Sequence, residues 1–198
     1  MRVQGDIVRI NGKSYTLGKR IGGGLQGSVF EIESGPSGVK TSNYVIKVIN
    51  DEKMSLDSKL GAISHLRELK LLADTHADLK RIMTLPRGIL DDDIGYIMAN
   101  ADGYESLSKF MDPPAEGFDE WFVTRYSLKR RYLILIDLFD SLRTVHINGL
   151  VFADLSPSNI MVLYGLRLVG HSDRQLELAL AEQAHVDQVL LVLESEGC

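Results

Sequence analysis

The sequence contains a single cysteine, Cys198, which is the last of its 198 residues. One cysteine excludes an intramolecular disulfide and is typical of proteins in a reducing compartment. No apolar run approaches the roughly 20 residues that a membrane-spanning helix needs. The first residues also lack the apolar core of a signal peptide. We therefore expect a soluble, cytoplasmic protein.

The chain also lacks an excess of positive charge, since its net charge is −5. A negative protein has no global field that would gather nucleic acid or an anionic membrane. We interpret the local run Lys129-Arg130-Arg131 as a solvated helix face. Hydrophobic residues make up 44% and charged residues 25%, which are ordinary values for a globular chain of one domain or two lobes.

A glycine-rich stretch runs from Ile21 to Phe30 and fits the pattern G-x-G-x-x-G-x-V. The residues that match are Gly22, Gly24, Gly27 and Val29. Glycines let a backbone approach a polyphosphate closely, and exposed amides there can bind its oxygens. A dinucleotide-binding loop would lead into a helix, whereas Val29 and Phe30 favour a strand. The alternative is a hairpin turn without a ligand, and Lys47 downstream favours nucleotide binding.

A second notable stretch, residues 150–162, places two apolar runs around a short polar loop. The loop contains Asp154 and Asn159, and Pro157 between them fixes φ and removes a donor. A rigidly held carboxylate and carboxamide could serve as a proton acceptor and a metal ligand. The alternative is an ordinary Asp/Ser/Pro/Asn turn between two strands.

Apolar periodicity predicts strands in the first half of the chain. Alternation around Asn11-Gly12 predicts a hairpin. The expected strands are 8–10, 15–17, 29–32, 44–49, 83–90 and 94–98. A helix is expected over 58–72, with Ile63, Leu66, Leu69 and Leu72 on its apolar face.

Two more helices are expected further along the chain. The first spans Ser127 to Ile147 and ends at Asn148-Gly149. Its buried face is predicted to contain Leu128, Tyr132, Leu135, Phe139, Leu142 and Val145. The second spans Ser172 to Leu193, starting with a possible capping box.

From about Ile21 to Val162 the chain resembles a protein kinase. The resemblance rests on three patterns in order: the glycine stretch, Tyr44-Val-Ile-Lys47 and the Asp154–Asn159 loop. The resemblance implies an α+β fold. It has a complete, antiparallel, β-rich N-lobe with one helix, residues 1–101, and a truncated, mainly helical C-lobe, residues 102–198. The Ala-Asp-Leu-Ser sequence of the loop is similar to that of the atypical RIO kinases and of some bacterial kinase-like proteins.

The resemblance also implies roles for individual residues. Lys47 would hold the α- and β-phosphates of ATP and pair with Glu68, Asp154 would act on the substrate hydroxyl, and Asn159 would bind Mg²⁺. The remaining candidates would surround the adenosine: Ile21, Gly22, Gly24, Gly27, Val29, Val45, Met98, Ala99, Ala101 and Glu105.

Several positions depart from the family pattern. Phe152 and Ala153 replace a His-Arg pair, and Ser156 replaces a lysine. In active relatives, a strand after the asparagine delivers a second aspartate to the metal. Residues 166–169 resemble that strand, and Gly170 then occupies the aspartate position, with Asp173 three residues later.

The sequence therefore predicts an ATP- and Mg²⁺-dependent protein kinase that transfers the γ-phosphoryl group to a serine or threonine hydroxyl of a protein. Two alternatives remain open. The first is a catalytically impaired pseudokinase or interaction module. The second is a fragment or frameshifted product of a longer kinase. The sequence leaves the protein substrate and the oligomeric state open.

Overall fold

The computed structural model describes residues 2–24, 27–125, 127–152, 155–164 and 187–192. The described residues form two compact units, one reaching to Asn100 and the other running from Ala101 to Val192. Among the described residues, no helix is both long enough and apolar enough to cross a membrane.

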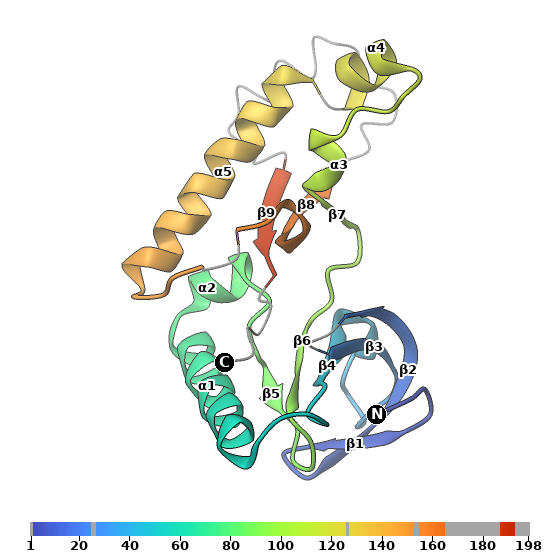
Figure 1. Cartoon of the computed structure of the whole chain (residues 1–198), viewed down its shortest axis with the longest axis vertical. Coiled ribbons are helices and arrows are strands. Elements are labelled where there is room, and N and C mark those ends of the chain that lie inside the picture. The colour runs from blue at the N-terminus through green and yellow to red at the C-terminus, as the bar shows by residue number, and fades with distance from the viewer. Residues whose placement is uncertain (1, 25–26, 126, 153–154, 165–186, 193–198) are drawn as a thin grey trace. The chain divides into compact units, whose positions relative to one another are not determined.

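A six-stranded antiparallel sheet forms the centre of the N-terminal unit, with the strand order β1-β2-β3-β4-β6-β5 (Figure 1). Its strands are β1 (Ile7–Ile10), β2 (Lys13–Gly23), β3 (Gly27–Ser34), β4 (Tyr44–Ile49), β5 (Gly88–Ile89) and β6 (Gly95–Ala99). The predicted hairpin is confirmed: Asn11 and Gly12 join β1 to β2 with φ of 52° and 72°. Positive φ at both central residues is what a type I′ hairpin turn requires.

The two edge strands of this sheet meet. Ile10 forms an isolated antiparallel bridge with Leu90, just after β5. Asp91 extends the link, because its N–H donates to the carbonyl of Arg9 over 2.9 Å. Its carboxylate accepts from the N–H groups of Asn11 and Gly12 at 3.0 and 2.7 Å. The sheet is therefore curled, and the β1–β2 turn is fastened to the turn between β5 and β6.

Side chains alternate across the sheet and build two apolar clusters. One cluster lies on the side that the curled sheet encloses: Val8, Ile10, Tyr15, Leu17, Phe30, Ile32, Ile46, Leu90 and Ile97. The other cluster joins the opposite side to a helix: Val45, Leu66, Ile94, Tyr96 and Met98. Burial raises the pKa of the Tyr96 phenol, so this side chain stays neutral within the second cluster.

Helix α1 (Leu56–Thr75) supplies Leu66 to that second cluster and also buries Leu69 and Ala73. Ser55 caps it, since the Ser55 Oγ accepts from the N–H of Ser58 at 3.1 Å. The predicted helix is confirmed and is about one turn longer than expected. A short helix, α2 (Ala77–Ile82), follows it. The strand predicted over 83–90 is confined to the two residues of β5, preceded by buried but irregular chain.

The C-terminal unit contains a three-stranded antiparallel sheet in the order β7-β8-β9 (Figure 1). Its strands are β7 (Tyr104–Ser106), β8 (Ile160–Tyr164) and β9 (Asp187–Leu191). Its helices are α3 (Ser108–Met111), α4 (Phe118–Glu120) and α5 (Leu128–Ile147). Single turns, η1 (Thr41–Asn43) before β4, η2 (Trp121–Arg125) after α4 and η3 (Pro157–Asn159) before β8, complete the described elements.

The predicted boundaries of helix α5 are confirmed, but its predicted buried face is wrong. The side chains that α5 buries are Ile134, Leu138, Ser141 and Val145. Of the expected face only Val145 is buried, whereas Tyr132 and Phe139 are 60% and 67% exposed. The helix carries apolar residues on more than one side, so periodicity alone could not decide which side packs.

The expectations after β8 also need correction. Residues 187–191 form strand β9 and pair with β8 from Ile160↔Leu191 to Tyr164↔Asp187, so the helix predicted to run to Leu193 does not extend through them. Strand β7 pairs with the other edge of β8. Both edges of β8 are therefore occupied over Met161–Leu163. Residues 166–169, Gly170 and Asp173 themselves lie outside the described residues.

Candidate nucleotide and metal site

Four of the predicted nucleotide-binding side chains lie on one face of the N-terminal sheet. Val29 of β3 is the cross-strand partner of Lys47, and Val45 of β4 is the partner of Met98 on β6. Residues two apart on a strand share a face, so Val45 and Lys47 connect the two pairs. This face carries two aliphatic side chains, a thioether and an amine, a combination suited to a flat apolar base beside a phosphate.

The glycine-rich turn lies at the end of the same strands. Gly24 donates its N–H to the carbonyl of Gly27 over 3.0 Å, which closes the turn between β2 and β3. A Cβ at Gly27 would lie 2.3 Å from the Val48 carbonyl oxygen, so the sheet itself requires glycine there. At Gly24 nothing lies within 4 Å of a Cβ, and at Gly22 only ordinary contacts with Val29 would arise. These two exposed positions leave the backbone open to a ligand. Ile21 beside them is 47% exposed.

Lys47 is 8% exposed in the middle of the sheet. Glu68, its expected partner, lies on the exposed side of α1, opposite the face that buries Leu66, Leu69 and Ala73. Among the described residues, the ion pairs do not include Lys47 with Glu68. The described arrangement therefore does not bring these two side chains together, although it places both on neighbouring elements of one unit.

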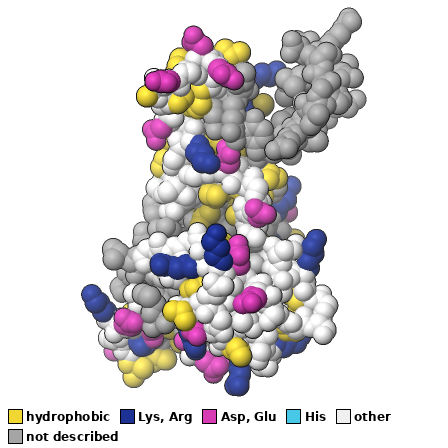
Figure 2. Space-filling model, turned by 90° about the vertical axis from the view of Figure 1, so that its right-hand side faces the viewer, with side chains coloured by type: hydrophobic (Ala, Val, Ile, Leu, Met, Phe, Trp, Pro, Cys, Tyr) yellow, Lys and Arg dark blue, Asp and Glu magenta, His cyan; other side chains and the backbone are white. Residues whose placement is uncertain are grey.

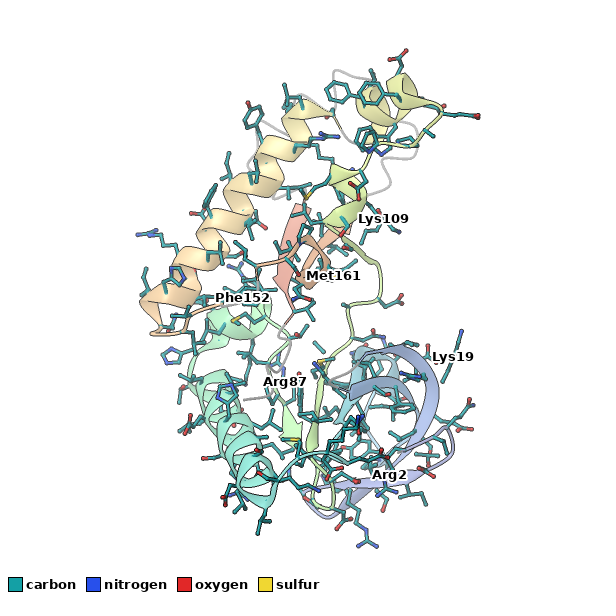
Figure 3. The ribbon with its side chains drawn as sticks, viewed as in Figure 1. Arg2, Lys19, Arg87, Lys109, Phe152 and Met161 are labelled. Carbon is teal, nitrogen blue, oxygen red and sulfur yellow. The ribbon has the colours of Figure 1, made fainter. Side chains whose placement is uncertain are left out.

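In the C-terminal unit the loop before β8 is held by backbone and side-chain hydrogen bonds. Asn159 ends η3, donates its N–H to the Ser156 carbonyl at 3.0 Å and is 3% exposed. The Ser106 Oγ of β7 donates to the carbonyl of Pro157 at 3.0 Å. The N–H of Val192 donates to the carbonyl of Asn159 at 2.8 Å. The loop that contains Asn159 is thus bonded to β7 on one side and to the residue after β9 on the other, close to Met161, which Figure 3 labels on β8.

The remaining predicted site residues belong partly to the first unit and partly to the second. Ala99 lies at the end of β6, where it pairs with Tyr44. The Ala101 carbonyl accepts from the N–H of Tyr104 at 3.0 Å, within a turn of the second unit. Glu105 is half-buried on β7, and its Oε1 lies 3.8 Å from the Nζ of Lys109. The predicted catalytic residue Asp154 lies outside the described residues.

Strand β9, which pairs with β8, was not predicted from the sequence. The residues that follow it were therefore not recognised as candidates. Helical periodicity over 172–193 concealed it, yet Val189-Leu-Leu-Val192 is a continuous apolar run that also fits a buried strand. In the sequence, β9 is followed by Val192, Leu193 and Glu194. No aspartate occurs after Asp187 in the sequence, and the first carboxylate after β9 belongs to Glu194.

Comparison with known proteins gives a consistent result. No family profile matches the sequence. Serine/threonine-protein kinase YabT of Bacillus subtilis (strain 168) is 23% identical over 159 residues, which cover 77% of this chain and 39% of that protein. The chain thus spans about two fifths of the length of the curated relative it matches.

Solved kinase domains share the fold. Crystal structures of three variants of the Mycobacterium tuberculosis PknI kinase domain align with TM-scores of 0.52, 0.54 and 0.55 at 14, 15 and 16% identity. The alignments cover 97% of this chain and 61 to 63% of those domains. The BubR1 kinase domain aligns with a TM-score of 0.53 at 12% identity, covering 96% of this chain and 49% of its own.

The fold is therefore α+β and protein kinase-like, as the sequence predicts. The chain is thus similar to the protein kinase-like superfamily, and its six-stranded sheet with α1 resembles the expected N-lobe. The likeness of the 152–159 loop to the RIO kinases stays a prediction.

Proposed function

We propose that this protein binds ATP with Mg²⁺ and acts as a protein kinase-like phosphotransferase on serine or threonine hydroxyls of a protein. The observation that carries the proposal is the shared sheet face of Val29, Val45, Lys47 and Met98 beside the open Gly22–Gly24 backbone. Adenine would pack between the aliphatic side chains, together with Ile21, and the turn would cover the phosphates.

Each remaining residue has a separate task in the proposed reaction. Lys47 would orient the α- and β-phosphates, and Asn159 would offer its amide oxygen to the metal. Asp154 would accept or orient the proton of the attacking hydroxyl. Mg²⁺, when bound, neutralises the charge that develops on the phosphate oxygens. The buried, doubly anchored backbone of Asn159 supports this role, because a ligand oxygen is most effective when its position is fixed.

A catalytically impaired, nucleotide-binding protein is the second candidate, and two observations favour it. Glu68 is exposed, so the described α1 does not present the carboxylate that would orient Lys47. The sequence places Gly170 at the position of the second metal-binding aspartate, and the first carboxylate after strand β9, which pairs with β8, belongs to Glu194 and not to an aspartate. Phosphoryl transfer is sensitive to such displacements.

Nucleotide binding is tested by thermal unfolding with and without millimolar Mg-ATP. A ligand at 100 times its Kd stabilises the native state by about 2.7 kcal/mol, so the wild type should unfold at a higher temperature with Mg-ATP. Lys47→Ala should lose most of this shift. Lys19→Ala is the matched control, because Lys19 is an exposed lysine of β2 (Figure 3). Absence of a shift in the wild type would contradict both candidates.

Transfer is tested by incorporation of labelled phosphate from ATP into a generic protein substrate or into the chain itself. Incorporation by the wild type that Asp154→Asn abolishes, while the Mg-ATP stabilisation persists, supports the enzyme. Stabilisation without any incorporation supports the impaired candidate. Equal incorporation in both proteins would remove Asp154 from the mechanism.

A further inference from the structure

Helix α5 (Figure 1) has a second apolar side besides the one that it buries. Five of its apolar side chains are between 43% and 67% exposed: Leu128, Tyr132, Leu135, Ile136 and Phe139. Four of them recur at steps of four, three and four residues, which places them on one side of a helix, and Ile136 lies next to Leu135. We call these five residues the α5 stripe. None of them belongs to the buried side, which contains Ile134, Leu138, Ser141 and Val145.

The α5 stripe is large for an apolar surface of a monomer. A buried aromatic side chain covers about 150–250 Å², so the exposed parts of the five side chains add up to roughly 600 Å². The largest apolar patch on a typical monomer measures about 300–600 Å² and is often a binding surface. Hydrophobic side chains also reach the surface around α4 (Figure 2), where Phe118 is 50% exposed. The stripe therefore has the size of a contact with another polypeptide.

The area fits one occupant in particular, a second copy of this chain. Two stripes packed against each other would bury roughly 1,200 Å² in total, which is the lower limit of the range for a specific, stable interface. Interfaces at this limit are typically weak. A dimer formed through the α5 stripe should therefore dissociate with a Kd on the order of micromolar.

The order of side chains along the stripe is nearly symmetrical about its middle. Tyr132 lies three residues before Leu135, and Phe139 lies three residues after Ile136. If two copies of α5 pack antiparallel with a two-fold axis at the middle, Tyr132 of each copy meets Phe139 of the other. Leu135 of each copy then meets Ile136 of the other. A two-fold interface requires this kind of self-complementary surface, and antiparallel packing also opposes the two helix dipoles.

The charges beside the stripe suit the same arrangement. Lys129 and Asp140 are both exposed and eleven residues apart, which is close to three full turns, so they flank the stripe on the same side. A two-fold axis brings the same flank of both copies together, and Lys129 of each copy then lies within about one turn of Asp140 of the other. The exposed Arg143 neighbours Asp140 on its own helix. Asp140 would thus lie between two cations, and such exposed pairs fix the register more than they add affinity.

We propose that the α5 stripe is the contact between two copies of this chain, packed antiparallel about a two-fold axis at Leu135 and Ile136. The dimer is weak, so the balance between monomer and dimer depends on protein concentration. This inference concerns the C-terminal unit alone and does not rest on the proposed kinase activity.

Sedimentation equilibrium of the full chain, at concentrations on both sides of the micromolar range, tests the dimer. The average mass should rise from that of one copy towards that of two. Ile136→Glu should weaken the association at least about tenfold, because it buries a carboxylate of each copy at the axis. Leu71→Glu is the matched control, at a 65% exposed leucine of α1, and should leave the association unchanged.

An exchange of charges tests the antiparallel register. Lys129→Glu alone should weaken the dimer, because it places a second carboxylate near Asp140 of the other copy. Lys129→Glu combined with Asp140→Lys should restore most of the loss.

A disulfide gives an independent measurement. In a Cys198→Ser background, Tyr132→Cys together with Phe139→Cys should, on oxidation, join position 132 of one copy to position 139 of the other. Within one helix these positions are about two turns apart, too far for a disulfide. Mass spectrometry of the digested, oxidised protein identifies the bond. This measurement remains decisive if Ile136→Glu does not fold.

Four outcomes would each overturn the proposal: a mass that stays at one copy throughout the range, a dimer that a folded Ile136→Glu leaves intact, a charge exchange that restores nothing, or an oxidised protein without the bond between positions 132 and 139. A chain that stays monomeric would leave the α5 stripe to another segment of the chain or to a different protein.

Discussion

The backbone N–H of Val192 donates a hydrogen bond to the carbonyl of Asn159 over 2.8 Å. This bond extends the pairing of β8 with β9 by one residue beyond Ile160↔Leu191. The asparagine proposed as a metal ligand is therefore a cross-strand neighbour of the residue that follows β9. Gly170, which the sequence analysis assigned to the second metal-binding position, lies outside the described residues, and that assignment stays a prediction.

This hydrogen bond gives a first prediction. Val192→Pro removes the donor and should lower the free energy of unfolding by about 1–3 kcal/mol, because it leaves the carbonyl of buried Asn159 without this partner. Val192→Ala keeps the N–H and should cost clearly less. Urea unfolding followed by circular dichroism measures both, and equal losses in the two variants would show that the bond contributes nothing.

The glycine turn gives a second prediction. Gly27→Ala places a Cβ 2.3 Å from the Val48 carbonyl oxygen, a backbone atom. The strands must shift apart, which should cost about 1–3 kcal/mol of stability. Gly24→Ala meets nothing within 4 Å and should change stability by less than about 0.5 kcal/mol. Thermal unfolding compares them, and similar melting temperatures for the two variants would contradict the described pairing of β3 with β4.

Two adjacent residues of α5 test which face of the helix is buried. Leu138 is 6% exposed and Phe139 is 67% exposed. Leu138→Ala should cost about 2–4 kcal/mol through the cavity it leaves, and Phe139→Ala less than about 0.5 kcal/mol. Chemical unfolding of the two variants decides. A larger loss of stability for Phe139→Ala than for Leu138→Ala would support the buried face predicted from the sequence.

Asp74 predicts a pH dependence of stability. Hydrogen bonding from Lys70, with a further contribution from Lys80, lowers the pKa of Asp74 below its ordinary value. A lowered folded-state pKa stabilises the fold above the unfolded pKa of about 3.9, and this contribution is lost as pH falls through the folded pKa.

The effect on stability should be small because the carboxylate is largely exposed. Asp74→Asn should cost a few tenths of a kcal/mol at pH 7, and the gap to wild type should close as pH falls through the lowered folded-state pKa of Asp74. The control is the same substitution in a Lys70→Met, Lys80→Met background, where no pH-dependent gap is expected. Urea unfolding at a series of pH values measures the gap, and a gap that widens on acidification would contradict the sign.

Local signals in the sequence predicted most of the N-terminal unit. Asn11-Gly12 fixes its hairpin through two positive φ angles. Alternation along β4 puts Val45 and Lys47 on one face of the strand and Ile46 on the other. Such features depend on the nearest residues in the chain. The meeting of Ile10 with Leu90 does not, because a single bridge between residues 80 apart leaves no local pattern.

The C-terminal unit was harder to predict for a physical reason. Helix α5 has apolar residues on several sides, so its packing depends on neighbours distant in sequence. Strand β9 pairs with β8 across an intervening stretch of more than twenty residues, from Tyr164 to Asp187, and its apolar run also suits a helix. The roles of Lys47, Glu68, Asn159 and Asp154 remain predictions, whose tests are given above.

The bridge between Ile10 and Leu90 has a consequence for how this protein meets others. Unpaired N–H and C=O groups along a free sheet edge are a template with which an extended segment of another molecule can pair. Over Arg9–Ile10 that template is already taken by Leu90 and Asp91. Strand addition by a peptide and edge-to-edge stacking of neighbouring molecules are therefore disfavoured at this edge. Association there must instead rely on side chains.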